Sequence, residues 1–169
     1  RGVPVVANDL RVDSAQPGLV LSGPNAGGKT VGLKTIGLAA LMVRSGIPIP
    51  ASDLSRVDWM APVRALVGDQ QAVSDDLSTF SAQLLGVRQA LEAGGPRSLL
   101  LLDELGMGTD PAQGAALAQA IVEALIQAGA RVVLTTHHAA LKSLAAEDPR
   151  WSLAGAVFAD GKPTYRIET

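Results

Sequence analysis

The chain contains no cysteine, so disulfide bonds and cysteine-based metal sites are excluded, and a reducing compartment is permitted. It also has no run of basic residues, and its net charge of −2 argues against a surface that grips nucleic-acid phosphates by itself. No apolar run approaches the length of a membrane span. We therefore expect a cytoplasmic protein without a membrane partner.

Aromatic residues make up only 3% of the chain although 47% of it is hydrophobic, so the core is expected to consist mostly of Leu, Val and Ala. The length of 169 residues indicates one domain, spanning 1–169. Internal repeats and low-complexity segments are absent. The N-terminus, Arg1-Gly2-Val3-Pro4, has neither an initiator Met nor the features of a signal peptide, so we expect an excised part of a longer multidomain chain.

One segment fills every fixed position of the phosphate-loop pattern G-x-x-x-x-G-K-[ST]. It consists of Gly23, Pro24, Asn25, Ala26, Gly27, Gly28, Lys29 and Thr30. It follows the apolar run 19–21 and precedes a helix-compatible segment, which is the strand–loop–helix context that the motif requires. Glycines let backbone N–H groups turn inward around a triphosphate, and the helix N-terminus adds its positive end. Lys29 is expected to reach the β- and γ-phosphates and Thr30 to bind Mg²⁺.

The pattern of apolar residues and turn signals indicates strands that alternate with helices. The expected strands are Val3–Leu10, Gly18–Ser22, Val63–Val67, Leu99–Asp103, Arg131–Thr136, and a final hairpin that turns at Asp160-Gly161. The expected helices are Gly28–Arg44, one beginning at Ser78 and ending before Gly94, and one capped by Asp110 with Pro111 at its first position and ending at Gly129. The first helix is apolar on nearly all sides, so we expect it to be buried against a sheet. The fold class is α/β with a mostly parallel sheet.

An acidic pair ends one of the expected interior strands. Asp103 would hold Mg²⁺ through its water shell, and Glu104, on the other side of the strand, could orient or deprotonate the attacking water. A second acid directly after the Mg²⁺ ligand suits hydrolysis by water and favours an ATPase over a kinase. His137, at the end of the next strand, could donate to the γ-phosphate or to that water. Its neighbour His138 is interpreted as structural.

Ser78 and Thr79 lie at a helix start, where backbone N–H groups and hydroxyls can bind an anion. Their spacing leaves two interpretations open, an ordinary Ser N-cap and a contact with phosphate.

Four motifs in this order resemble the MutS ATPases. The segment 23–30 resembles their GPNxGGK[ST] loop, 77–80 their STF signature, 103–110 their DE[IL]GxGT motif, and 136–137 their switch TH. Asp110-Pro111 after Thr109, and Leu77 where repair proteins tend to have Arg, point to the type two branch rather than to the mismatch-repair branch. The resemblance covers 4–167.

The resemblance implies an ABC-type P-loop fold that forms a head-to-tail homodimer around two ATP molecules with Mg²⁺. Ser78 and Thr79 would then approach the γ-phosphate bound to the partner chain. Val5 and Val6 would lie near the adenine, and Gln70 and Gln71 would fall in a loop that senses Mg²⁺ or water. Full-length members of this family resemble clamps that hold branched DNA or stalled ribosomes. They carry helical arms before this domain, and a coiled coil with a small nuclease domain after it. Nucleic acid would therefore be contacted by parts outside this chain.

Three alternatives to a clamp ATPase of the type two branch are considered. A module that senses ATP without significant turnover needs only the Mg²⁺ ligand, so the presence of both Asp103 and Glu104 disfavours it. The mismatch-repair branch is disfavoured by the details given above. The motor head of a membrane transporter carries an LSGGQ-like signature and a larger insertion before the acidic strand, whereas this chain has Leu77-Ser78-Thr79-Phe80.

Overall fold

The computed structural model describes residues 5–67, 76–107 and 109–168. The strands, in chain order, are β1 (Gly18–Ser22), β2 (Val63–Leu66), β3 (Leu99–Asp103), β4 (Arg131–Thr135), β5 (Trp151–Ala159) and β6 (Lys162–Glu168). The helices are α1 (Lys29–Arg44), α2 (Asp76–Ala93), α3 (Pro111–Gln127) and α4 (Ala139–Glu147), with a short 3-10 turn, η1 (Asn25–Gly27), before α1.

The strands form one six-stranded sheet in the order β2-β3-β4-β1-β5-β6. The first five strands in this order are parallel, and β6 returns antiparallel to β5. The register aligns Asp103 of β3 with Thr135 of β4, and Thr135 with Leu21 of β1. The carboxyl ends of β3, β4 and β1 therefore meet at one edge of the sheet, where ligands bind in open α/β folds.

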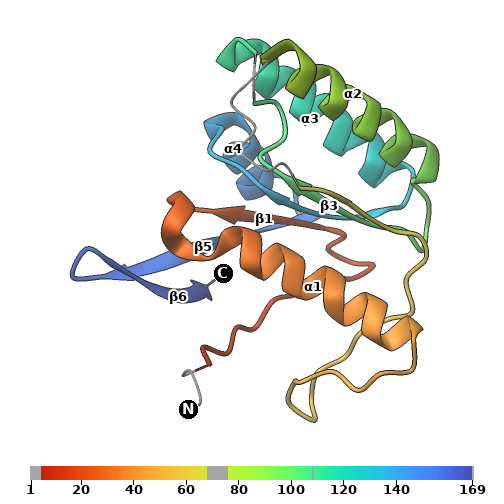
Figure 1. Cartoon of the computed structure of the whole chain (residues 1–169), viewed down its shortest axis with the longest axis vertical. Helices are drawn as coiled ribbons and strands as arrows, with labels where there is room; N and C mark the ends of the chain where they lie inside the picture. The colour runs from red at the N-terminus through yellow and green to blue at the C-terminus, as the bar shows by residue number, and fades with distance from the viewer. Residues whose placement is uncertain (1–4, 68–75, 108, 169) are drawn as a thin grey trace.

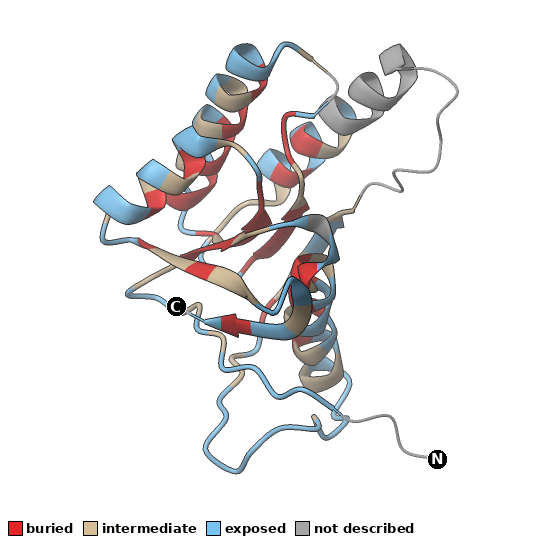
Figure 2. Cartoon of the chain, turned by 90° about the vertical axis from the view of Figure 1, so that its left-hand side faces the viewer, coloured by how far each residue is buried: buried red, intermediate tan, exposed pale blue. Residues whose placement is uncertain are grey.

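Helices cover both faces of the sheet (Figure 1). On one face, α2, α3 and α4 pack over a cluster that includes Leu100, Val132 and Leu134. On the other face, α1 packs through Leu33 and Ala40 against a second cluster. Figure 2 shows the buried residues gathered on the strands and on the helix faces turned toward them. No helix in the described ranges has both the length and the apolar character needed to cross a bilayer.

Most expected elements are present. The strand Leu99–Asp103 has the expected bounds, and the carboxylate of Asp110 caps α3 by accepting from the backbone N–H groups of Ala112 and Gln113, at 3.1 Å each. The final hairpin turns at Asp160-Gly161, where both residues have positive φ, as a tight I′ turn requires.

One expectation about secondary structure is wrong, and two features were not foreseen. The described part of the expected strand Val3–Leu10 is not a strand; Asn8 instead pairs with β6 through its side-chain amide, donating to Tyr165 O at 3.1 Å and accepting from Ile167 N–H at 2.7 Å. Helix α1 packs against the sheet as expected, but through one side only, since Leu38 and Leu41 are exposed. Helix α4 was not anticipated, because its nine residues are too few for a clear helical period.

Candidate phosphate-binding site

The phosphate-loop segment joins β1 to α1 and packs closely against β5. Gly23 and Gly28 have φ values of 123° and 88°, a backbone region that side chains strongly disfavour. Gly27 is required for a different reason, because a Cβ atom there would lie 2.5 Å from Cβ of Ala156. The glycines therefore give the loop both its turns and its approach to the sheet.

Lys29, the first residue of α1, folds back over this loop. It is only 2% exposed, and its ammonium donates to the carbonyl oxygen of Gly23. Its Nζ also lies 3.2 Å from Nε2 of His137, which follows β4. Burial lowers the pKa of Lys29, because the charged ammonium is poorly solvated there, and the nearby carboxylates of Glu104 and Asp103 partly offset this effect.

Hydroxyl groups from α1 and β4 both bond the carboxylate at the end of β3. Thr30 Oγ1 donates to Asp103 Oδ1 at 3.2 Å, and Thr135 Oγ1 donates to the same oxygen at 2.5 Å. Thr135 is fully buried, and its hydroxyl also accepts the backbone N–H of Glu104 at 3.0 Å. Thr135 thus fixes the positions of both acidic residues.

Glu104 leaves β3 with a φ of 51°, which is unusual for a residue other than glycine. Its backbone N–H is shared between the carbonyl and the hydroxyl of Thr135. Its carboxylate oxygen Oε1 lies 3.3 Å from Nε2 of His137. The left-handed turn, rather than simple alternation along the strand, directs this carboxylate toward His137.

The two oxygens contributed by Thr30 and Asp103 suit Mg²⁺. Mg²⁺ binds oxygen ligands in octahedral geometry at about 2.0–2.1 Å, so neighbouring ligand oxygens lie about 3 Å apart. The distance of 3.2 Å between Thr30 Oγ1 and Asp103 Oδ1 is close to this value. Within the described ranges, no group of three or more His, Cys, Asp or Glu residues could hold a metal. A cation here would complete its shell with water and phosphate oxygens, as Mg²⁺ commonly does.

The sequence-predicted residues differ in how far the structure supports their placement. Lys29, Thr30, Asp103, Glu104 and His137 are brought together, and their roles toward a nucleotide stay predictions. Val5 and Val6 lie in the irregular segment before β1, with side chains 92% and 37% exposed. Ser78 and Thr79 lie in the first turn of α2, but their side chains are outside the described part. Gln70 and Gln71, and residue 108 of the DE[IL]GxGT motif, are also outside it.

Two residues near the site were missed from the sequence. The sequence pattern marks Thr135 only as part of a strand, although its position directly before Thr136-His137 is a signal that it lies near the site. Tyr165 on β6 lies beside the phosphate loop, with its Cδ1 atom 3.5 Å from where a Cβ of Gly28 would be. Its ring is half exposed and its φ is 59°, a strained value for an aromatic residue. No local pattern links residue 165 to a loop at 23–30, so only the fold reveals this neighbour.

Comparison with known proteins identifies the family. A family model described as MutS domain V matches residues 19–158, which is most of the chain. The chain belongs to the MutS family as a MutS domain V. The matched range contains the phosphate loop, the acidic pair and His137.

The MutS domain V described here is also similar to curated proteins named endonuclease MutS2. It is 44% identical to the protein of Anaeromyxobacter sp. over 99% of this chain. It is 48% identical to the protein of Pelotomaculum thermopropionicum and 43% identical to that of Brevibacillus brevis, in each case over 96% of this chain. The chain spans about a fifth of the length of these relatives, 21% in each case. These matches support the MutS2 branch of the family.

Proposed function

We propose that residues 1–169 act as a single Mg²⁺-dependent ATPase domain with the ABC-type P-loop fold. The observation that carries the proposal is the convergence of five side chains from three neighbouring strand ends: Lys29, Thr30, Asp103, Glu104 and His137. A buried ammonium, a hydroxyl–carboxylate pair and a second carboxylate beside a histidine are the groups that phosphoanhydride hydrolysis uses.

Phosphate binding would fall to the loop 23–30 and to Lys29. The loop and the N-terminus of α1 present backbone N–H groups to an anion. Lys29 would exchange the carbonyl oxygen of Gly23 for phosphate oxygens, and this exchange gains charge complementarity because the ammonium is buried. Thr30 and Asp103 would hold Mg²⁺, which when bound neutralises phosphate charge and polarises the bond that breaks.

Glu104 would act as the general base. Its carboxylate lies at the rim of the site beside His137, so it can accept a proton from a water positioned between it and the terminal phosphate. His137 contacts both Glu104 and Lys29, and it would report the presence of the γ-phosphate to the base. The adenine ring of the nucleotide would contact Tyr165, and also Val5 and Val6 in the segment before β1.

The domain would work as a homodimer with composite sites, in which Ser78 and Thr79 at the start of α2 contact the γ-phosphate bound to the partner. ATP binding would close the dimer, and hydrolysis would remove the bridging contacts. The name endonuclease MutS2 is that of the relatives. For the whole protein we propose a DNA-binding clamp on branched DNA or stalled ribosomes, with nuclease activity outside residues 1–169.

The experiment that tests the ATPase proposal compares the full-length protein with its Glu104→Gln variant. Loss of a general base slows turnover by about 100- to 10,000-fold. We expect the variant to bind Mg·ATP in calorimetry and to accumulate as an ATP-bound dimer in light scattering. Single-turnover cleavage at the wild-type rate by the variant would refute the role of Glu104. Binding without turnover by the wild-type dimer would instead identify an ATP sensor.

A further inference from the structure

The chain has two tryptophans with opposite environments. Trp151 is 3% exposed and packs in the core, whereas Trp59 is 53% exposed in the segment between α1 and β2. An isolated exposed apolar residue needs no explanation. Trp59 is different because charged side chains gather around it.

Two arginines from other segments lie over the Trp59 ring. The guanidinium carbon of Arg44, the last residue of α1, is 5.8 Å from the ring centroid, and that of Arg97, just before β3, is 5.9 Å from it. The backbone supports this arrangement, since Ala61 N–H donates to Arg97 O at 2.8 Å. Both arginines are exposed, and among the residues that the structure describes neither forms an ion pair.

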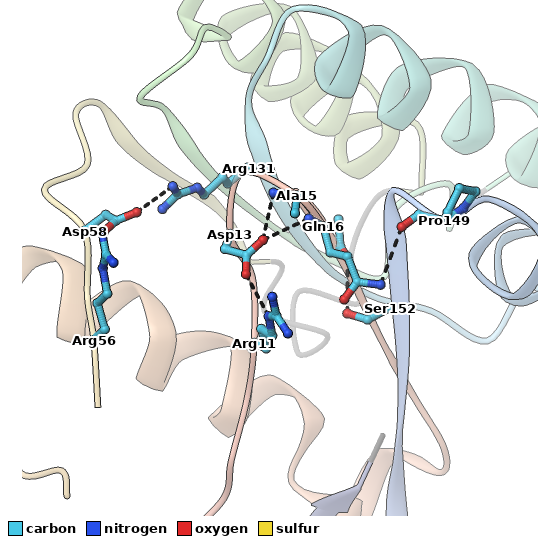
Figure 3. Close-up of polar contacts among 10 residues, drawn as sticks. Arg11, Asp13, Ala15, Gln16, Arg56, Asp58, Arg131, Pro149 and Ser152 are labelled. Carbon is cyan, nitrogen blue, oxygen red and sulfur yellow. Dashed lines mark hydrogen bonds and ion pairs between the residues drawn. The ribbon is translucent and has the colours of Figure 1, made fainter. Parts of the chain in front are cut away.

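The acid that directly precedes Trp59 in the chain, Asp58, is already shared. It accepts from Arg56 at 3.2 Å and from Arg131 at 2.6 Å, as Figure 3 shows. Because one carboxylate serves two guanidinium groups there, it does not neutralise Arg44 and Arg97. Arg44 and Arg97 therefore each place an exposed positive charge beside Trp59, although the chain as a whole carries a net charge of −2.

This surface lies at the opposite end of the sheet from the phosphate loop. Helix α1 begins at the carboxyl end of β1 and ends at Arg44, while Trp59 and Arg97 come shortly before the starts of β2 and β3. These residues therefore belong to the amino ends of the parallel strands. Figure 1 shows α1 running from the phosphate-loop side toward that end of the sheet. A ligand bound there would not compete with a nucleotide at the loop 23–30.

We propose that Arg44, Trp59 and Arg97 form a binding surface for single-stranded nucleic acid. Guanidinium groups contact phosphates and stack on bases, and the indole, which stays 53% exposed beside the two guanidinium groups, adds aromatic surface for an unpaired base. An acidic peptide would use the charges but not the indole, and duplex bases are not free to stack. The surface is independent of the proposed ATPase activity, and it places a nucleic-acid contact within this chain, where the lack of basic runs predicts none.

The test is titration of the 169-residue chain with a fluorescence-silent oligonucleotide, dT12, monitored by tryptophan emission without nucleotide. Quenching reports Trp59, because Trp151 is buried. The variant Trp59→Ala lacks the reporting indole, so its binding is measured by the fluorescence anisotropy of labelled dT12. We expect this variant to bind dT12 about tenfold more weakly, since stacking on one aromatic residue has effects of this size. Trp59→Phe keeps an aromatic face and is expected to retain most of the affinity.

The arginines are tested through the salt dependence of binding. Each phosphate neutralised on a single strand contributes about 0.7 to the slope of log K against log salt. The double variant Arg44→Gln/Arg97→Gln is therefore expected to reduce the slope by about 1.4, whereas Trp59→Ala leaves the slope unchanged. The matched control is Arg88→Gln/Arg166→Gln, which removes the same charge from α2 and β6 and is expected to bind as wild type.

Several outcomes would overturn the proposal. Displacement of dT12 by Mg·ATP would place the oligonucleotide at the phosphate loop instead. Equal binding of dT12 and polyglutamate, with no effect of Trp59→Ala, would indicate an acidic-peptide surface. If dT12 did not quench tryptophan emission of the wild-type chain at 20 mM salt, while circular dichroism showed that the wild type and each variant are folded, the cluster would serve only to pack the α1–β2 segment. None of these results depends on ATP turnover, so they leave the proposed ATPase function unaffected.

Discussion

Replacing Thr135 by Val tests how the two acidic residues are held in place. The side chain is fully buried, and its hydroxyl donates to Asp103 at 2.5 Å while accepting the backbone N–H of Glu104 at 3.0 Å. A hydrogen bond to a charged group contributes about 1.5–3 kcal/mol. Burying a methyl group in place of the hydroxyl offsets this by about 0.8 kcal/mol. Glu104 N–H keeps the carbonyl of Thr135 as an acceptor, so no donor is orphaned.

The expected net loss is about 1–2 kcal/mol in the free energy of unfolding. For a chain of this size, 1 kcal/mol shifts the melting temperature by about 2–4 °C, so the variant should melt about 2–8 °C lower in circular dichroism. Turnover should fall about tenfold to a hundredfold, because displacing a catalytic group by about 1 Å has effects of this size. Nucleotide binding without Mg²⁺ should be little changed, since Lys29 and the loop 23–30 are untouched.

The matched control is Thr135→Ser, which keeps the hydroxyl and removes the methyl group. Its stability should fall by about 0.8 kcal/mol, the contribution of one buried methyl group, while turnover in the full-length dimer should stay near the wild-type value. The two variants therefore differ in activity more than in stability. If Val at 135 supported wild-type turnover, or if Ser at 135 were as slow as Val, the positioning role of the hydroxyl would be refuted.

Two further predictions concern the loop and the acid stability of the chain. Gly27→Ala should lower both thermal stability and ATP affinity, because its Cβ would lie 2.5 Å from Cβ of Ala156, and adding Ala156→Gly should restore part of both losses; no recovery in the double variant would show that the clash is not the cause. The pKa of Asp13 is lowered to about 2 by hydrogen bonds from the backbone N–H of Gln16, the side chain of Arg11 and the backbone N–H of Ala15, shown in Figure 3. Its charge thus contributes stability that is fully present above the ordinary pKa of 3.8 and is lost as the pH falls toward 2. In urea unfolding, the free energy of unfolding of the wild type should therefore exceed that of Asp13→Asn above pH 4, and the two values should converge near pH 2. A constant difference down to pH 2 would contradict this.

The sequence by itself determined the local elements that carry the candidate site residues. The strand Leu99–Asp103 is confirmed, because a continuous apolar run encodes it locally. The glycines at fixed spacing in 23–30 likewise predict the turn that leads from β1 into α1, whereas phosphate binding by this loop stays a prediction. The cap of α3 and the turn at Asp160-Gly161 were also identified from local rules, since a single side chain or dipeptide satisfies the backbone there.

The tertiary structure decided everything that depends on distant partners. Val5 and Val6 carry strand propensity, yet their segment forms no ladder, because Asn8 makes the contacts with β6 instead. Strand register places Thr135 between Asp103 and Leu21, a relation across more than thirty positions of sequence that no local pattern encodes. Tyr165 reaches the phosphate loop in the same way, through the pairing of β5 with β6 and the packing of the loop on β5.

The arginines at Trp59 show the same difference between what the sequence determines and what the fold determines. The sequence fixes the number of arginines and shows that no basic run exists, because composition and spacing are properties of the chain alone. Only the fold brings Arg44 and Arg97 to the same indole, because the end of α1 and the start of β3 meet at one edge of the sheet. Local propensities act over a few residues, whereas a site made by converging strand ends depends on packing between segments far apart in the chain.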